Sequence, residues 1–127
     1  MISLRGREAE FTTFVGRGDL SIPEVLEAYS IFLLRAPSQL VLWDFTEAKL
    51  TGERDDLAMW RLAVMAVRLA KGRRTTGRTA IVCSCPEDFD HAGTLRTYLG
   101  IAGYPVLVKE FVNVKMARSW LMEEPRA

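Results

Sequence analysis

The clearest strand in this sequence is LVLWDF, residues 40–45. Its first four side chains are all apolar, and the first polar residue is Asp44. Side chains alternate between the two faces of a strand, so an apolar run of this kind predicts a central strand with helices packed on each side. We expect Asp44, near the carboxyl end of the strand, to accept hydrogen bonds from backbone amides.

A hairpin and a helix are predicted before this central strand. Residues 2–5 form a weak strand and residues 10–15 a better one, which is rich in Phe and Thr and is expected to be broken by Gly16-Arg17-Gly18. The polar residues 6–8 provide the turn between the two strands. Ser21 and Glu24 have the spacing of a capping box, which predicts a helix that ends at Ala36-Pro37-Ser38.

Helices and strands alternate after the central strand. A second helix opens at Thr51-Gly52-Glu53 and runs to about Lys71, with Thr51 as its N-cap. A buried strand follows at residues 79–83, and Ser84-Cys85-Pro86-Glu87 starts a third helix that reaches about Gly100.

The last two predicted elements are a short strand and a helix. Pro105 places the strand of residues 104–108 at or near an edge of the sheet, because proline cannot donate a ladder hydrogen bond. The closing helix runs from Val112 to about Met122 and is expected to bury Val112, Met116, Trp120 and Leu121.

The order of predicted elements is therefore ββαβαβαβα, with about five strands and about four helices. An opening hairpin followed by alternating units predicts an α/β fold with a mixed, mostly parallel central sheet. The length of 127 residues suits a single domain, residues 1–127.

Composition excludes several classes of function. The chain has 17 Lys and Arg against 16 Asp and Glu, a net charge of +1 that does not fit a uniformly basic nucleic-acid binder. Two cysteines and one histidine offer little for a disulfide framework or a metal site, so no cofactor or metal is expected. The longest apolar stretch, residues 57–70, is too short to span a membrane and no secretory signal precedes it, which favours a cytoplasmic protein.

Three regions of the sequence resemble the sulfate-transporter and anti-sigma-factor-antagonist (STAS) family, specifically the SpoIIAA-like group of small bacterial proteins. Residues 15–23, from Val15-Gly16 to Ile22-Pro23, resemble the passage from a strand to the first helix, and VLWDF of residues 41–45 resembles the third strand. Residues 77–82 and 117–121 resemble the last strands and the closing helix. The resemblance covers nearly the whole chain and implies a non-enzymatic regulatory module that binds another protein.

Antagonists of this family carry a phosphorylated Ser at the start of the second helix, in an Asp-Ser-x-Gly-like motif that a partner kinase recognises. The matching residues here, KLTGE at 49–53, lack the Asp-Ser pair, and the Thr51 hydroxyl takes roughly that place. A phosphate on Thr51 would meet the carboxylates of Glu53, Asp55 and Asp56. We therefore expect Thr51 to be a helix cap rather than a phosphoacceptor.

The second predicted helix carries more apolar surface than one sheet covers. Arg54, Arg61 and Arg68 fall within one narrow stripe, whereas a helix that lies on a sheet and faces water normally shows a wide polar face. Packing against neighbouring helices of the same domain is one explanation. The alternatives are a protein partner, a second copy of the chain included, or a small apolar or acyl ligand. The residues proposed for that surface are Thr51, Gly52, Met59, Trp60 and Met65.

Cations gather around the end of the second helix. Residues 57–86 contain no acid and six cations: Arg61, Arg68, Lys71, Arg73, Arg74 and Arg78. These charges complement the negative end of the helix. Alternatively, Arg68, Lys71, Arg73 and Arg74 form a patch for an acidic partner or a phosphorylated ligand. Nucleic acid is not expected, because no Trp or Tyr between residues 61 and 86 offers a stacking surface.

The remaining chemistry is confined to Cys83, Cys85 and His91. A thiol near a helix start can be reactive, so an enzyme that uses Cys85 is an alternative function. We expect instead a buried Cys83 that closes its strand, an inert Cys85 and a surface His91. No Ser-His-Asp set, phosphate-binding glycine loop or paired-carboxylate motif occurs in a recognisable context, so the expected role is not enzymatic.

Overall fold

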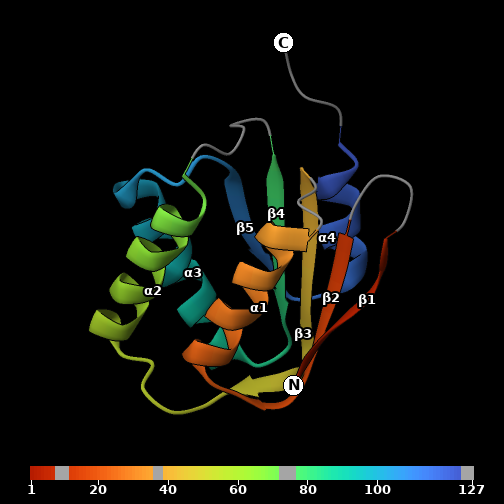
Figure 1. Ribbon diagram of the computed structural model, residues 1–127. Helices are drawn as coiled ribbons and strands as arrows, with labels where there is room; N and C mark the ends of the chain where they lie inside the picture. The colour runs from red at the N-terminus through yellow and green to blue at the C-terminus, as the bar shows by residue number, and fades with distance from the viewer. Residues whose placement is uncertain (8–11, 36–38, 72–76, 124–127) are drawn as a thin grey trace.

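The computed structural model describes residues 1–7, 12–35, 39–71 and 77–123 (Figure 1). Its element order, ββαβαβαβα, confirms the predicted α/β fold. The strands are β1 (Ile2–Arg7), β2 (Thr12–Leu20), β3 (Leu40–Leu50), β4 (Arg78–Cys83) and β5 (Leu107–Phe111). The helices are α1 (Ile22–Arg35), α2 (Asp56–Leu69), α3 (Pro86–Ala102) and α4 (Val114–Leu121).

The strands form one sheet in the order β1-β2-β3-β4-β5. β1 pairs antiparallel with β2, and every later pair is parallel, as the hairpin followed by alternating units predicts. β5 is an edge strand, but it begins two residues after Pro105. The turn expected at residues 6–8 is wrong in part, because Gly6 and Arg7 belong to β1; residue 8 lies outside the described residues.

Helices cover both faces of the sheet. α1, α2 and α3 lie on one face and α4 lies on the other (Figure 1). The central strand shows the split directly, because Val41 and Trp43 belong to the core under α1–α3, whereas Leu42 packs with α4. All three side chains are buried, which confirms that LVLWDF is a strand covered on both sides.

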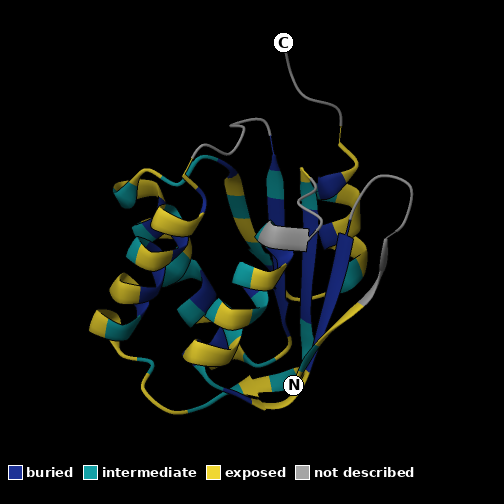
Figure 2. Cartoon of the chain, viewed as in Figure 1, coloured by how far each residue is buried: buried dark blue, intermediate teal, exposed yellow. Residues whose placement is uncertain are grey.

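α2 contacts the sheet less than α1 and α3 do. It packs against α3 and α1, and its buried residues are Met59, Leu62, Ala63 and Ala66. Its outer side remains largely exposed (Figure 2). The exposed apolar side chains there are Leu57, Trp60, Met65 and Leu69. Neighbouring helices therefore cover one side of α2 and leave the other to solvent.

The expected break of β2 at Gly16-Arg17-Gly18 is wrong. The strand continues to Leu20 because residues 17–20 pair with residues 47–50 of β3, with a bulge between Val15 and Arg17. Gly18 takes the left-handed conformation, φ 71°, which glycine adopts without strain. Pairing with a distant segment thus overrides the local breaker.

Three helix starts were predicted from local signals, and the first and the third are confirmed; α3 begins at Pro86. At α1, the Glu24 amide donates to Ser21 Oγ at 3.4 Å and the Ser21 amide donates to Glu24 Oε1 at 3.3 Å. α2 begins at Asp56 rather than Thr51, because the Asp55 side chain accepts from the Ala58 amide at 2.9 Å. Thr51 instead donates its backbone amide to the Leu20 carbonyl at 2.7 Å.

The last helix buries fewer residues than predicted. Val112 precedes α4 and is exposed, because the helix begins only after the Asn113 cap. Met116 is exposed and Trp120 is half-buried, because they do not lie on the inner side of the helix. Leu121 is buried against Leu42 and Val82, as expected.

Candidate functional site: a cavity between the helices and the sheet

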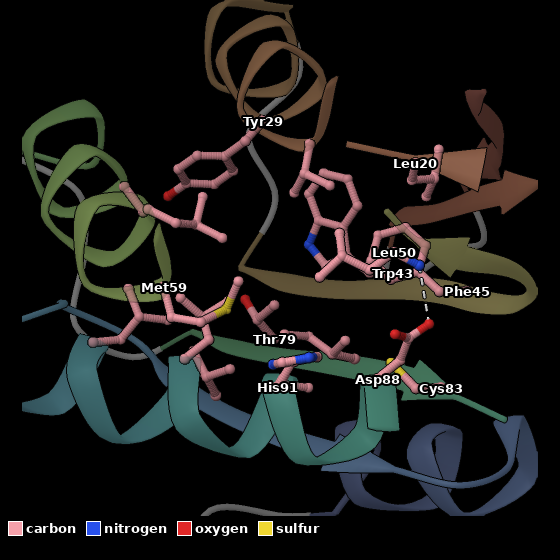
Figure 3. Close-up of a pocket in the computed structure, with 18 of the residues that line it drawn as sticks. Leu20, Tyr29, Trp43, Phe45, Leu50, Met59, Thr79, Cys83, Asp88 and His91 are labelled. Carbon is pink, nitrogen blue, oxygen red and sulfur yellow. Dashed lines mark hydrogen bonds between the residues drawn. The ribbon is translucent and has the colours of Figure 1, made fainter. Parts of the chain in front are cut away.

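A cavity of about 130 Å³ lies between α1–α3 and the sheet (Figure 3). α1 and α3 form two sides, α2 closes the outer side, and β3 and β4 provide the floor. Most of its lining is apolar or aromatic. Protein interiors hold few voids larger than a water molecule, so a space of this size is a departure from ordinary core packing.

The floor of the cavity is set by aromatic residues of β3. Trp43 stacks on Phe14 with ring centroids 4.4 Å apart, which fixes its plane. Phe45 lies against Gly16 of β2, where a Cβ atom would approach the Phe45 ring to 2.6 Å. Gly16 therefore lets the Phe45 side chain reach its place in the cavity wall.

Small residues of the helices leave the space open. α2 contributes Met59, Leu62 and Ala66 to the lining, and α3 contributes Ala92. Ala66 and Ala92 are buried, and larger side chains at these positions would extend into the cavity. The volume thus depends on two methyl groups in the helical layer.

Three polar side chains that line the cavity are Thr79, Tyr29 and Tyr104. The Tyr29 and Tyr104 hydroxyls form a hydrogen bond of 2.6 Å between α1 and the residue after the Gly103 turn. Thr79 projects from β4 and is buried. These groups lie within an otherwise apolar wall.

Asp88, in the first turn of α3, is the buried acid of the cavity. The Leu50 amide donates to its Oδ2 at 3.0 Å, which ties the end of β3 to α3 (Figure 3). Its other oxygen, Oδ1, is buried and has no hydrogen-bond partner among the described residues. Asp88 as a whole is 7% exposed.

The Cys83 thiol also lines the cavity, beside Asp88. Burial, followed by the negative charge of Asp88, raises its pKa from 9.0 to about 12. Cys83 therefore stays protonated near neutral pH, and a protonated thiol is a poor nucleophile. Its burial at the end of β4 is as predicted.

Cys85 and His91 occupy the beginning of α3. Cys85 is the half-buried N-cap residue, and its side chain forms no capping hydrogen bond. His91 was expected on the surface, but it is half-buried and lines the cavity because α3 turns this face toward the sheet. Its Nε2 lies 3.9 Å from Glu87 Oε1. No group of three or more His, Cys, Asp or Glu side chains suited to a metal ion occurs within the described ranges.

The residues predicted for a partner or ligand surface do not form one site. Met59 is 2% exposed and lines the cavity, so it is not a surface residue. Trp60 and Met65 lie on the outer side of α2. The Trp60 ring packs edge-on against the Tyr98 ring, with ring centroids 5.5 Å apart. Thr51 and Gly52 lie in the loop before α2. Helical geometry thus divides these side chains between the cavity and the outside.

The predicted cationic patch is only partly described. Arg68 and Lys71 are exposed at the end of α2, whereas Arg73 and Arg74 lie outside the described residues. Arg78 is directed elsewhere, because its Nη1 donates to the Trp120 and Glu123 carbonyls at 2.7 Å each. Arg54 precedes α2 and forms an ion pair of 3.3 Å with Glu87, so it does not continue the arginine stripe of the helix.

Sequence reasoning missed the aromatic floor and Asp88 as parts of a cavity. Trp43 was recognised as a core residue, but no sequence pattern reports the empty space above it. Asp88 carries a signal in the sequence, because it is an acid that falls on the inner side of a helix. Asp44 Oδ1 accepts from the Thr46 amide at 3.0 Å, as expected. Its predicted place near the strand end is wrong, because β3 continues to Leu50.

Comparisons with family models, curated proteins and solved structures find no match to this chain. Within the described part of the chain, none of the helices combines the length and apolar character needed to cross a membrane.

Proposed function

We propose that this protein is a binding protein, a carrier or a sensor, for a small apolar ligand held in the cavity between α1–α3 and the sheet. The observation that carries the proposal is an apolar space of about 130 Å³ in an otherwise packed core. The surface that lines this space is almost entirely apolar, and its burial against an apolar molecule is favourable.

The lining supports a compact, flat or short-chain ligand. Trp43, Phe45 and Tyr29 offer aromatic surfaces, and Leu62 and Leu95 offer aliphatic contacts. An engineered apolar cavity of about 150 Å³ in another protein binds benzene, which sets the scale for the molecule expected here.

A binding role rather than an enzymatic one is supported by the state of the nearest thiol. Cys83 touches the cavity, but its raised pKa, about 12, keeps it protonated and unreactive near neutral pH. The free thiols of Cys83 and Cys85 are in keeping with a reducing compartment, and we propose the cytoplasm.

A second candidate function is a regulatory protein-interaction module, as the resemblance to SpoIIAA-like proteins implies. Leu57, Trp60, Met65 and Leu69 are exposed apolar side chains on α2, two on each flank of Arg61 and Arg68. Exposed apolar side chains that gather on one surface are typical of sites that bind a partner or a second copy. Because the inner side of the same helix closes the cavity, ligand occupancy and partner binding would act on one element.

Native mass spectrometry of protein purified without detergent tests the two functions together. The ligand role predicts a retained small-molecule mass in the wild type and its loss in Ala66→Leu, whose added carbons fill the cavity. The interaction role predicts a dimer or heteromeric complex that Trp60→Ala weakens and Ala66→Leu preserves. Ligand mass that persists in Ala66→Leu would show that the cavity is not the site.

A further inference from the structure

We infer that the ligand presents a hydrogen-bond donor to Oδ1 of Asp88, so that the cavity takes a small neutral alcohol or a comparable donor-headed molecule. This inference rests on the proposed ligand-binding function and specifies the polar end of the ligand. The inference narrows the expected class of ligand, because it favours an alcohol over a hydrocarbon and over a carboxylic acid.

Among the described residues, one carboxylate oxygen of Asp88 has no hydrogen-bond partner. Its side chain is more than nine-tenths buried and lines the cavity, with Oδ2 held by the Leu50 amide at 3.0 Å. Oδ1 has no partner within the described ranges. Buried polar atoms in proteins nearly always have a partner, and leaving one without costs about 1–3 kcal/mol. A donor from a molecule in the cavity removes that cost.

The carboxylate of Asp88 selects the chemistry of the ligand head group. An ionised carboxylate accepts hydrogen bonds and donates none, so an ether or nitrile gains nothing at Oδ1. A ligand carboxylate would meet the charge of Asp88 in a buried, poorly solvated place, with Glu87 one residue away in the chain. A neutral hydroxyl satisfies Oδ1 without either penalty.

The proposed head-group position lies at one end of the apolar lining. Figure 3 shows Asp88 and Cys83 at one end of the lining and Tyr29 and Met59 toward the other. A molecule whose hydroxyl meets Asp88 therefore extends its apolar part over Trp43 and Ile81, which lie in the same wall. The cavity volume suits a single ring with a short arm.

The test compares three probes of similar size by calorimetric or NMR titration: toluene, benzyl alcohol as a donor, and benzonitrile as an acceptor only. In the wild type, benzyl alcohol should bind roughly tenfold or more tightly than benzonitrile, as expected for a hydrogen bond to a carboxylate. Equal binding, or tighter binding of benzonitrile, would overturn the inference. This wild-type comparison can overturn the inference by itself if a variant does not fold.

Asp88→Asn should replace the hydrogen-bond acceptor at the head-group position with a donor. The Leu50 amide still requires an acceptor, so the Asn oxygen takes the place of Oδ2 and its NH₂ group takes the place of Oδ1. The tenfold preference for benzyl alcohol should then disappear or reverse toward benzonitrile. An unchanged preference in folded Asp88→Asn would contradict the assignment.

Thr79→Val is the matched control, because it removes another buried hydroxyl of the lining and leaves Asp88 intact. The preference for benzyl alcohol should persist in this variant; its loss there would place the head group at Thr79 instead and overturn the inference. Failure of all three probes, toluene included, would contradict the proposed binding function itself. Toluene binding without a donor preference would contradict the inference alone.

Discussion

The two faces of the sheet are covered in different ways. On one face, α4 lies directly on β3, β4 and β5, and buries Ala117 and Leu121 against Leu42, Ala80 and Val82. On the other face, α1 and α3 stand beside α2, which contacts these helices, and a cavity of about 130 Å³ remains above Trp43. The two faces of β3 are therefore covered differently: α4 packs closely on one face, and the helices on the other face leave a cavity.

The largest expected contrast comes from truncating one buried side chain on each face. Leu121→Ala should lower the free energy of unfolding by about 3–4 kcal/mol, because Leu121 is surrounded by packed residues. Met59→Ala should cost only about 2 kcal/mol, since one side of Met59 already borders empty space. Denaturant unfolding measures both values, and a larger loss for Met59→Ala would contradict the difference between the faces.

Enlarging an alanine on each face should change stability in opposite directions. Ala117→Leu places three carbons into a full layer and should lower stability by about 1–3 kcal/mol. Ala66→Leu fills part of the cavity and should raise the free energy of unfolding by about 1 kcal/mol. Thermal unfolding of the two purified variants gives the comparison, and destabilisation of both would mean that the space beside Ala66 is not available.

The pH dependence sharpens the account of the buried thiol beside the cavity. The pKa of Cys83 is raised from 9.0 to about 12, so its stabilising contribution is complete below pH 9 and is lost between pH 9 and 12, where only the unfolded chain releases the proton. The expected slope is about 1.4 kcal/mol per pH unit. Denaturant unfolding of the wild type and Cys83→Ala between pH 8 and 11 measures it. The variant should lose this component of the decline, and parallel curves would contradict the assignment.

The smallest effect on stability is expected on the outer side of α2. Leu57→Ser changes a side chain that is 54% exposed and should alter the free energy of unfolding by less than about 0.5 kcal/mol. If the outer side of α2 binds a partner or a second copy, the same change should reduce the sedimenting complex. A loss of stability comparable to that of Met59→Ala would show that this side of α2 is covered within the domain.

The fold was predictable because each element carries a local signal that the tertiary structure keeps. The apolar run at 40–45 became β3, and the Ser21–Glu24 box began α1. Errors arose where a distant contact overrides a local pattern. β2 passes through Gly16 and Gly18 because β3 supplies its hydrogen bonds. Thr51 is held by the Leu20 carbonyl, and Asp55 caps α2 in its place.

The sequence predicted the excess apolar surface of α2, but it did not predict the position of the cavity. The sequence showed that α2 has too much apolar surface for one sheet, and the structure places part of this excess, Met59 and Ala66 included, around a cavity. The position of that cavity depends on how far α2 stands from β3 and β4, which no residue pattern encodes. Asp88 was obscured for the same reason, since its partner Leu50 is 38 residues away.

An NMR titration of the wild type and Ala66→Leu with toluene examines ligand binding in the cavity itself. The account predicts saturable shifts in the wild type that centre on the methyl groups of Ala66, Ala92 and Leu62, and no saturable binding to Ala66→Leu. Absence of binding to the wild type, or equal binding to both proteins, would contradict the account of the cavity as a ligand site.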